Sequence, residues 1–169
     1  LTRTPQGPLP PIQMRLGTTR GTNALLEEKG ARVVFFVTEG FGDLLRIGDQ
    51  RRPDLFVLDV KKPLPLHAEV VEVPGRLDSQ GNVIQSLRTE LLKQKANELV
   101  ARGRQVAAVM LLHSYRNSAH ELAVKDVLLE CGFEYVACSC QLAPFIKAVP
   151  RAETTVVDAY LGPLMTEYL

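Results

Sequence analysis

The amino-acid sequence predicts an α/β fold: a mixed, mostly parallel sheet flanked by helices, with an added β-hairpin. Two uninterrupted apolar runs of strand length, Val33–Val37 and Val106–Leu112, predict central strands that helices cover on both faces. The order strand, helix, strand from Val106 to Cys138 predicts a parallel crossover unit. The turn-forming sequence Asp78–Asn82, which lies between two short β-prone segments, predicts the hairpin.

Composition and charge are those of one ordinary globular domain. The chain has 169 residues, 46% of them hydrophobic, and its 20 Lys and Arg against 19 Asp and Glu give a formal net charge of +1. This balance provides no excess positive field for a phosphate backbone or an anionic bilayer, so we expect no nucleic acid and no membrane partner. No apolar run approaches the roughly 20 residues that cross a bilayer, and no signal-peptide pattern is present, so we expect a cytoplasmic protein.

The N-terminal segment is expected to be a linker. Residues 1–13 are rich in proline, and each proline fixes φ and removes a backbone donor, so this stretch cannot sustain a helix. Residues 14–169 are assigned to the α/β domain. Because a natural chain begins with Met, the start at Leu1 indicates a fragment of a longer chain.

The first half of the domain predicts two helices with a strand between them. Thr22–Lys29 contains helix-forming residues, and Gly30 is placed to end this helix in a left-handed turn. The β-branched and aromatic run Arg32–Thr38 predicts a buried strand. Glu39–Ile47 can form a second, short helix with an apolar side.

A hairpin and a long helix are expected next. Ala68–Val73 alternates valine with glutamate and is predicted to pair with the short strand Val83–Ile84. Apolar residues at helical spacing then predict a helix over Ser86–Arg102, which should face the sheet through Leu91, Leu92 and Leu99.

The last third predicts a helix, a strand and a terminal helix. Ser118 and Glu121 have the reciprocal spacing of a capping box that opens a helix through Leu129. Glu134–Ser139 predicts a strand. A terminal helix over Glu153–Tyr168 is expected to be interrupted near Gly162 and Pro163.

Two polar segments are candidate sites. Arg15–Ala24 places glycines and threonines directly before a helix, where backbone N–H groups and hydroxyls can bind a phosphate or a carboxylate. Simple capping by Thr19 or Thr22 is the alternative, and chemistry alone favours it. The segment is not a Walker loop, because the Gly-Lys-Ser/Thr ending is absent.

The second segment, His113–Asn117, follows an apolar strand, and α/β sheets bind ligands at the carboxyl ends of their strands. His113 could act as an acid or base and Arg116 could bind an anion, whereas a solvated loop is an equally weighted alternative. Ser114 lacks the Gly-x-Ser-x-Gly surroundings of a triad nucleophile.

The remaining reactive residues predict no metal site. Cys138 and Cys140 are expected on a strand, and both are interpreted as buried small residues rather than metal ligands. His67 and His120 are expected at the surface. Arg52, in the turn Arg51–Asp54, could bind a carboxylate, although a solvated turn is favoured.

Several long stretches of the chain resemble the hydantoinase/5-oxoprolinase family, and in particular the N-terminal region of its large subunits. Members often carry Val-Ala where this chain has Arg20-Gly21, a variant associated with the 5-oxoprolinase-like branch. The stretches that carry the resemblance are Arg15–Ala31, Val37–Gly48, Arg52–Phe56, Leu111–Glu121 and Thr154–Leu161.

The resemblance implies a fragment of an ATP-dependent cyclic amidohydrolase that opens 5-oxoproline or hydantoin rings through a phosphorylated amide, with ATP and Mg²⁺ as cofactors. It implies three partners: a small cyclic amide substrate, the C-terminal remainder of the chain, and a second hydantoinase-type subunit or domain. The family's large subunits resemble actin-like ATPases, whose first phosphate loop is expected upstream and whose second half is expected beyond Leu169. The isolated fragment is therefore expected to be inactive.

The resemblance does not identify the catalytic residue, and His113, from its place after an apolar strand, is the candidate. The residues assigned to substrate or phosphate binding are Gly17, Thr18, Thr19, Thr22, Asn23, Arg52, Ser114 and Asn117. Two alternatives stay open: the related subunit of an acetone-carboxylase-type enzyme, which uses phosphorylated substrates to form C–C bonds, and a non-catalytic structural module of such a complex.

Overall fold

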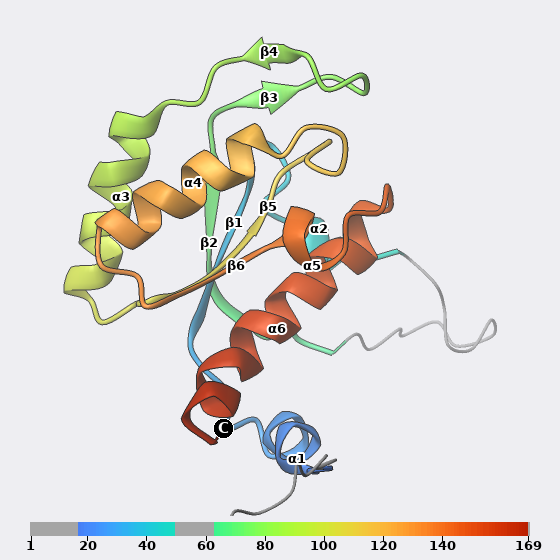
Figure 1. Ribbon diagram of the computed structural model, residues 1–169, viewed down its shortest axis with the longest axis vertical. Helices are drawn as coiled ribbons and strands as arrows, with labels where there is room; N and C mark the ends of the chain where they lie inside the picture. The colour runs from blue at the N-terminus through green and yellow to red at the C-terminus, as the bar shows by residue number, and fades with distance from the viewer. Residues whose placement is uncertain (1–16, 50–62, 169) are drawn as a thin grey trace, which may run out of the picture.

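A four-stranded parallel sheet forms the centre of the structure, a computed structural model that describes residues 17–49 and 63–168 (Figure 1). The strand order is β2-β1-β5-β6, and each neighbouring pair is parallel. The strands are β1 (Val33–Thr38), β2 (His67–Val73), β5 (Val106–Met110) and β6 (Tyr135–Cys138). The predicted fold class, a mostly parallel α/β sheet with a separate hairpin, is confirmed.

Helices cover both faces of the sheet because the two central strands are apolar on both sides (Figure 1). On one face, Val34 and Phe36 pack with the helices α3 (Thr89–Ala101) and α4 (Ala119–Glu130). On the other face, Val33, Phe35 and Val37 pack with the long helix α6 (Ala148–Tyr168). The period of two along β1 therefore distributes its side chains between two hydrophobic layers. The prediction of two central, covered strands is confirmed.

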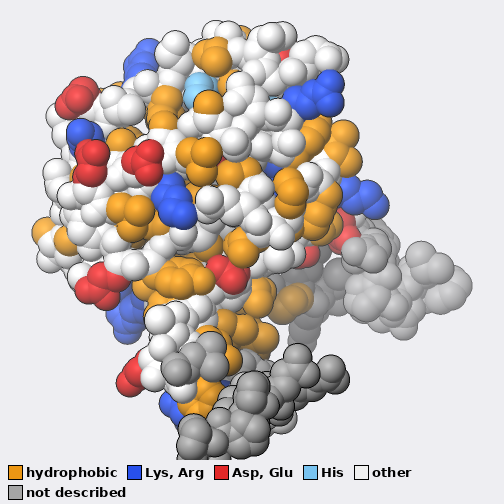
Figure 2. Space-filling model, in the orientation of Figure 1, with side chains coloured by type: hydrophobic (Ala, Val, Ile, Leu, Met, Phe, Trp, Pro, Cys, Tyr) orange, Lys and Arg blue, Asp and Glu red, His pale blue; other side chains and the backbone are white. Residues whose placement is uncertain are grey.

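Three short helices complete the domain. They are α1 (Arg20–Leu26), α2 (Leu44–Ile47) and α5 (Ser139–Leu142). Helix α1 packs on the C-terminal part of α6, where Gly21 approaches the side chains of Leu161 and Met165. In the described residues no helix is both long enough and apolar enough to span a bilayer. Figure 2 shows basic and acidic side chains interspersed over the visible face, as the balanced composition predicts.

The hairpin exists, but the sequence prediction paired the wrong strands. The short strands β3 (Arg76–Leu77) and β4 (Val83–Gln85) pair antiparallel, and Asp78 closes their turn by accepting hydrogen bonds from the amides of residues 80 and 82. Strand β2 instead pairs in parallel with β1 and forms an edge of the main sheet. Alternation between valine and glutamate suits any half-buried edge strand, so it does not specify the partner. Pro74 and Gly75 separate β2 from the hairpin.

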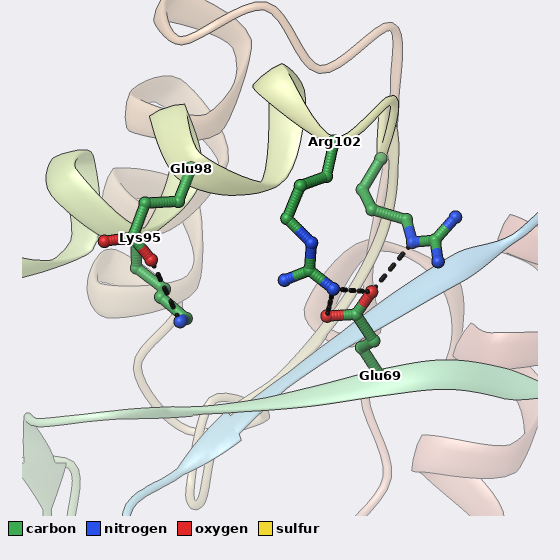
Figure 3. A network of polar contacts seen from close by, with 5 residues as sticks. Glu69, Lys95, Glu98 and Arg102 are labelled. Atoms are coloured by element: carbon green, nitrogen blue, oxygen red, sulfur yellow. Dashed lines mark hydrogen bonds and ion pairs between the residues drawn. The ribbon is translucent and has the colours of Figure 1, made fainter.

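An ion-pair network joins edge strand β2 to the end of α3 (Figure 3). Both Glu69 carboxylate oxygens accept hydrogen bonds from Arg102 Nη2 at 2.9 Å, and Oε1 accepts another from Arg104 Nε at 2.8 Å. The Arg104 hydrogen bond, assisted by Arg102, lowers the pKa of Glu69 below its ordinary value. The network connects two elements that are distant in sequence.

Helices α6 and α3 differ from the prediction, the first in its extent and the second in the face that it buries. Helix α6 begins at Ala148 and runs through Pro163 without the expected interruption. Its Gly162 lies so close to the Tyr135 ring that a Cβ would collide with it, so close packing supports the helix at this point. Helix α3 faces the sheet through Leu92 and Leu99, but Leu91 is exposed, contrary to expectation.

The turn after α1 also differs from the prediction. Glu28, with φ 54°, adopts the left-handed conformation that was assigned to Gly30. Gly30 instead lies against the Tyr160 ring, where a side chain would collide. The backbone of Ala31 then donates to the Tyr160 carbonyl at 2.9 Å. Close approach to α6, rather than a positive φ, explains a glycine at position 30.

Candidate functional site

Polar side chains gather at the carboxyl ends of β1, β5 and β6. The segment that joins β5 to α4 begins there, and the amide of Leu112 donates to Thr38 Oγ1 at the end of β1, at 2.9 Å. Ser139 follows β6 directly and is buried. Because parallel sheets bind ligands at this edge, it is the first candidate site.

His113 lies in this segment with an unusual backbone and an unpaired ring nitrogen. Its φ is 61°, a left-handed conformation that costs a non-glycine residue about 1–2 kcal/mol. Its Nδ1 is buried and has no hydrogen-bond partner among the described residues. Its carbonyl accepts hydrogen bonds from the amides of Arg116 and Asn117, at 2.9 and 3.1 Å, which hold the turn. Backbone strain and an unsatisfied polar atom at a ligand-binding edge support His113 as a functional candidate.

Ser114 and Asn117 use their side chains to hold this segment together. Ser114 is buried, and its Oγ lies 2.9 Å from both the Leu111 carbonyl and Arg151 Nη1. Asn117 Nδ2 donates to the Gly81 carbonyl of the hairpin at 2.8 Å, and its Oδ1 accepts from the amide of Ala119. The ligand-binding role assigned to these two residues stays a prediction.

The amide of Ala119 shows why the predicted capping box is wrong. Ser118 makes no side-chain cap hydrogen bond, and Asn117 satisfies the start of α4 instead. Glu121 is fully buried and bonds outside its own helix. Its burial and its distant hydrogen-bond partners override the local spacing that predicts a capping box.

Sequence reasoning missed a buried polar network behind His113. Glu121 is 0% exposed and Arg151 is 1% exposed. Glu121 Oε1 accepts from the Leu111 amide at 2.7 Å and from Ser139 Oγ at 2.6 Å, and Oε2 accepts from the Cys140 amide at 2.8 Å. Arg151 Nη2 donates to the Leu111 carbonyl at 2.8 Å. Ser114 and Ser139, whose Oγ atoms are 3.3 Å apart, lie between the two charges.

A signal for these residues existed in the helical spacing. Glu121 lies three residues before Val124, on the inward stripe of its helix, and Arg151 adjoins the buried Ala152. Burial lowers the pKa of the Arg151 guanidinium, and the Glu121 carboxylate opposes this shift. Its intrinsic pKa is so high that Arg151 stays charged, so the edge contains a buried pair of opposite charges.

The cysteines and the other two histidines are packing residues. Burial, followed by the Glu121 charge, raises the pKa of both Cys138 and Cys140 to about 12, so neither thiol is reactive at neutral pH. Cys140 lies in α5 rather than on the expected strand. His120 is buried, contrary to the expected surface position, and His67 is half-buried beside the Phe35 ring. Burial lowers the pKa of both imidazoles.

The glycine-threonine segment forms a second candidate site at the start of α1. A pocket of about 490 Å³ opens there, and Arg20 and Lys29 contribute positive charge to its wall. Its full lining is Thr18, Thr19, Arg20, Asn23, Ala24, Glu27, Lys29, Leu164 and Tyr168. Gly17 and Thr22 are exposed beside it.

The contacts of this segment bear on the capping alternative. Thr19 is the residue that precedes α1, but its side chain makes no cap hydrogen bond. Thr18 Oγ1 accepts from the Arg20 amide at 3.1 Å, and Thr22 lies inside the helix. The two threonines that chemistry nominated as caps, Thr19 and Thr22, are therefore free of that role.

The two candidate sites lie at opposite ends of the strands, the first at their carboxyl ends and the second toward their amino ends. Helix α6 reaches both, because Arg151 contacts the carboxyl end of β5 whereas Leu164 and Tyr168 line the pocket beside α1 (Figure 1). Leu164 lies thirteen residues after Arg151 along the helix, a rise of about 20 Å. The described structure does not bring the sites together. Arg52, its turn and the expected linker lie outside the described residues.

Comparisons with known proteins agree on one family. Residues 12–132 match the hydantoinase/oxoprolinase N-terminal region. The chain is 43% identical to 5-oxoprolinase 1 of Arabidopsis thaliana, in an alignment that covers 99% of this chain and 15% of the relative. It is 35% identical to the acetophenone carboxylase gamma subunit of Aromatoleum aromaticum, over 90% of this chain and 23% of that subunit.

A solved structure gives the same result. The ATP-dependent caprolactamase from Pseudomonas jessenii superposes with a TM-score of 0.79 at 29% identity, over 90% of this chain and 23% of that one. The chain thus spans between about a seventh and a quarter of the length of these relatives.

Proposed function

Because the chain belongs to the hydantoinase/oxoprolinase N-terminal-region family, we propose that it forms part of an ATP-dependent enzyme that opens a cyclic amide, 5-oxoproline or a hydantoin. The observation that carries this proposal is the 43% identity, over almost the whole chain, to a 5-oxoprolinase. The similarity to an ATP-dependent caprolactamase, whose name describes a cyclic amide and ATP, supports the same chemistry.

The chemistry explains the need for ATP. Resonance makes an amide carbonyl a poor electrophile, and transfer of the γ-phosphoryl group to its oxygen converts that oxygen into a leaving group. One water adds to the carbon, and the ring C–N bond breaks as the nitrogen takes a proton, which leaves an acyl phosphate. A second water adds to the acyl carbon and expels phosphate with the former carbonyl oxygen, so that ADP, phosphate and the ring-opened acid are the products. This chain's contribution is to bind and orient the ring and to move a proton.

His113 is proposed as the acid or base. Its unpaired Nδ1 lies at the ligand-binding edge of the sheet, and neutral imidazole can take a proton from attacking water or return one to the leaving ring nitrogen.

The pocket beside α1 is proposed to bind substrate or a phosphoryl group through Gly17, Thr18, Thr19, Thr22 and Asn23. Lys29 pairs with Glu27 at 2.7 Å on the wall of this pocket, so Arg20 is the positive charge that favours an anion there. Arg52, Ser114 and Asn117 remain proposed ligands by family resemblance. Among residues 17–49 and 63–168 no group of three or more His, Cys, Asp or Glu side chains could hold a metal ion, and Mg²⁺ remains a cofactor proposed from the family resemblance.

Turnover by the full-length protein tests the proposal. ADP release should require 5-oxoproline or a hydantoin and should equal ring-opened product, and His113→Ala should lower kcat/KM by about 10²-fold or more. The isolated domain should show neither activity, because we propose that the remainder of the chain and a second subunit complete the site. The proposal would be contradicted if neither 5-oxoproline nor a hydantoin caused ADP release in an amount equal to ring-opened product.

A carboxylase is the second candidate, favoured by the 35% identity to a carboxylase subunit. Such an enzyme would join bicarbonate to a ketone at the expense of ATP. Acetone or acetophenone with bicarbonate in the same assay would then stimulate ADP release, whereas 5-oxoproline would not. A non-catalytic module is the third, and wild-type activity of His113→Ala and Thr19→Ala would favour it.

A further inference from the structure

Leu111, the residue after β5, has both of its backbone polar groups bound by buried charged side chains. Its N–H donates to Glu121 Oε1 of α4 at 2.7 Å, and its carbonyl accepts from Arg151 Nη2 of α6 at 2.8 Å. Helices from the two faces of the sheet thus bind the two backbone polar groups of one residue, at the carboxyl ends of the strands. This residue starts the turn that carries His113.

Hydrogen counting shows that the serines connect the two charges. Ser139 has one hydroxyl hydrogen, which it donates to Glu121 Oε1 at 2.6 Å. Ser114 accepts from Arg151 Nη1 and can donate either to the Leu111 carbonyl at 2.9 Å or to Ser139 Oγ at 3.3 Å. Because Arg151 also supplies the Leu111 carbonyl, the second choice leaves no acceptor unsatisfied. A continuous chain then runs from guanidinium to carboxylate.

Stability alone is a poor explanation for this arrangement. Removing two charges from water costs more than most buried ion pairs return, and apolar residues of similar volume are often at least as stable. Arg151 Nε, moreover, has no hydrogen-bond partner among the described residues. What the pair does achieve is geometric, since it fixes Leu111 and Ser114 on either side of Leu112 and the strained His113.

We propose that Arg151 and Glu121 are positioning residues, which act through Leu111 and Ser114 to hold His113 at the carboxyl edge of the sheet. The catalytic meaning of this inference rests on the proposed role of His113, whereas its geometric content does not. Lysine at position 151 would keep the charge but could not donate to both Leu111 and Ser114 in the planar fork that Arg151 provides.

Amide hydrogen exchange in the full-length protein tests the geometric content. Arg151→Lys and the milder Ser139→Ala should raise exchange of residues 108–117 by about tenfold and leave β1 unchanged. Thr155→Val is the matched control, because buried Thr155 lies one turn along α6 and bonds only to the Arg151 carbonyl. Equal effects of all three variants, or no local effect of either test variant, would overturn the inference.

A double-mutant cycle in kcat/KM tests whether Arg151 acts on catalysis through His113. The substrate is whichever cyclic amide the full-length protein opens. Arg151→Lys should lower kcat/KM by about tenfold or more in the presence of His113 and by less than about twofold in His113→Ala. Equal losses in both backgrounds would overturn positioning and leave the role of His113 intact. Wild-type kcat/KM in His113→Ala would overturn the proposed role of His113, whereas the exchange experiment would still decide the geometry. If Arg151→Lys does not fold, Ser139→Ala completes both tests.

Discussion

At the scale of single residues, the backbone distinguishes His113 from its neighbours. Glu28 and His113 are the two non-glycine residues with positive φ in the described part of the chain, at 54° and 61°. Glu28 is exposed at the end of a short helix, where a left-handed residue is common, whereas His113 is half-buried at the carboxyl ends of the strands, where we propose a ligand site. The same conformation therefore ends a helix at one position and aims a side chain at the other.

Glycine substitution at these two positions separates strain from function. His113→Gly should keep or raise the free energy of unfolding, by up to about 1 kcal/mol, because relief of left-handed strain offsets the entropy of glycine. It should also abolish most activity of the full-length protein. Glu28→Gly is the control and should gain similar stability with normal activity. A large loss of stability in His113→Gly alone, measured by denaturant unfolding, would contradict this account.

The pocket beside α1 gives a second prediction at this scale. Thr19→Ala and Asn23→Ala should lower kcat/KM of the full-length protein and leave its thermal midpoint almost unchanged, because both side chains are exposed and Thr19 makes no cap bond. Thr18→Ala should cost about 0.5–1 kcal/mol, because Thr18 Oγ1 accepts from the Arg20 amide. If Thr19→Ala or Asn23→Ala instead lowers the midpoint with turnover intact, capping explains the segment.

At the scale of elements, the sequence predicts the strands and helices that are determined locally. Uniform apolar runs predict β1 and β5, and helical spacing predicts α3. Strand β2 was predicted as an element but given the wrong partner, because its alternation fits either a hairpin or a sheet edge.

The polar network could not be predicted because its contacts are not local. The Arg151 side chain bonds to Ser114 and Leu111, which lie 37 and 40 positions earlier in the sequence. Glu121 bonds to Ser139, which lies 18 positions later. Local spacing could have shown that Glu121 faces inward, but it could not identify the partners of Glu121 or of Arg151. The segment His113–Asn117 was predicted as a candidate site because its position after an apolar strand is itself a local feature.

Adjacent leucines of α3 provide a matched test of packing. Leu92 is 3% exposed and packs against the sheet, whereas Leu91 is 49% exposed. Leu92→Asp should cost several kcal/mol, because it buries an unpaired charge. Leu91→Asp should change the free energy of unfolding by less than about 1 kcal/mol. Similar denaturation midpoints for the two variants would show that the orientation of α3 is wrong.

The ion pairs between β2 and the end of α3 predict a pH dependence. The pKa of Glu69 is lowered in the folded protein, so its stabilisation is present above its unfolded pKa and is lost as pH falls through the folded value. The advantage of wild type over Glu69→Gln should be about 0.5–1 kcal/mol at pH 7 and should vanish as pH falls from the unfolded pKa of Glu69 through its lowered folded pKa.

The exposed pair of Lys95 and Glu98 supplies the control (Figure 3). Glu98→Gln should change stability by a few tenths of a kcal/mol, because it removes one i,i+3 pair. Coincident unfolding curves for Glu69→Gln and wild type at every pH would show that the network contributes nothing to stability.

At the scale of the whole molecule, two polar sites at opposite edges of one sheet share helix α6. The carboxyl edge contains the buried charges and His113, and the amino edge contains the pocket beside α1. Because the chain spans only part of its relatives, we expect residues elsewhere in the full-length protein to complete both sites. We propose that this region belongs to an enzyme that uses ATP to activate a ring carbonyl.

Oxygen transfer in the full-length protein tests that claim most directly. 5-Oxoproline carrying ¹⁸O in its ring carbonyl is incubated with ATP, and the released inorganic phosphate is analysed by mass spectrometry. If the carbonyl oxygen is phosphorylated and water attacks the carbon, each turnover should place one labelled oxygen in phosphate. Ring opening that leaves phosphate unlabelled and all the ¹⁸O in the product carboxylate would contradict the account.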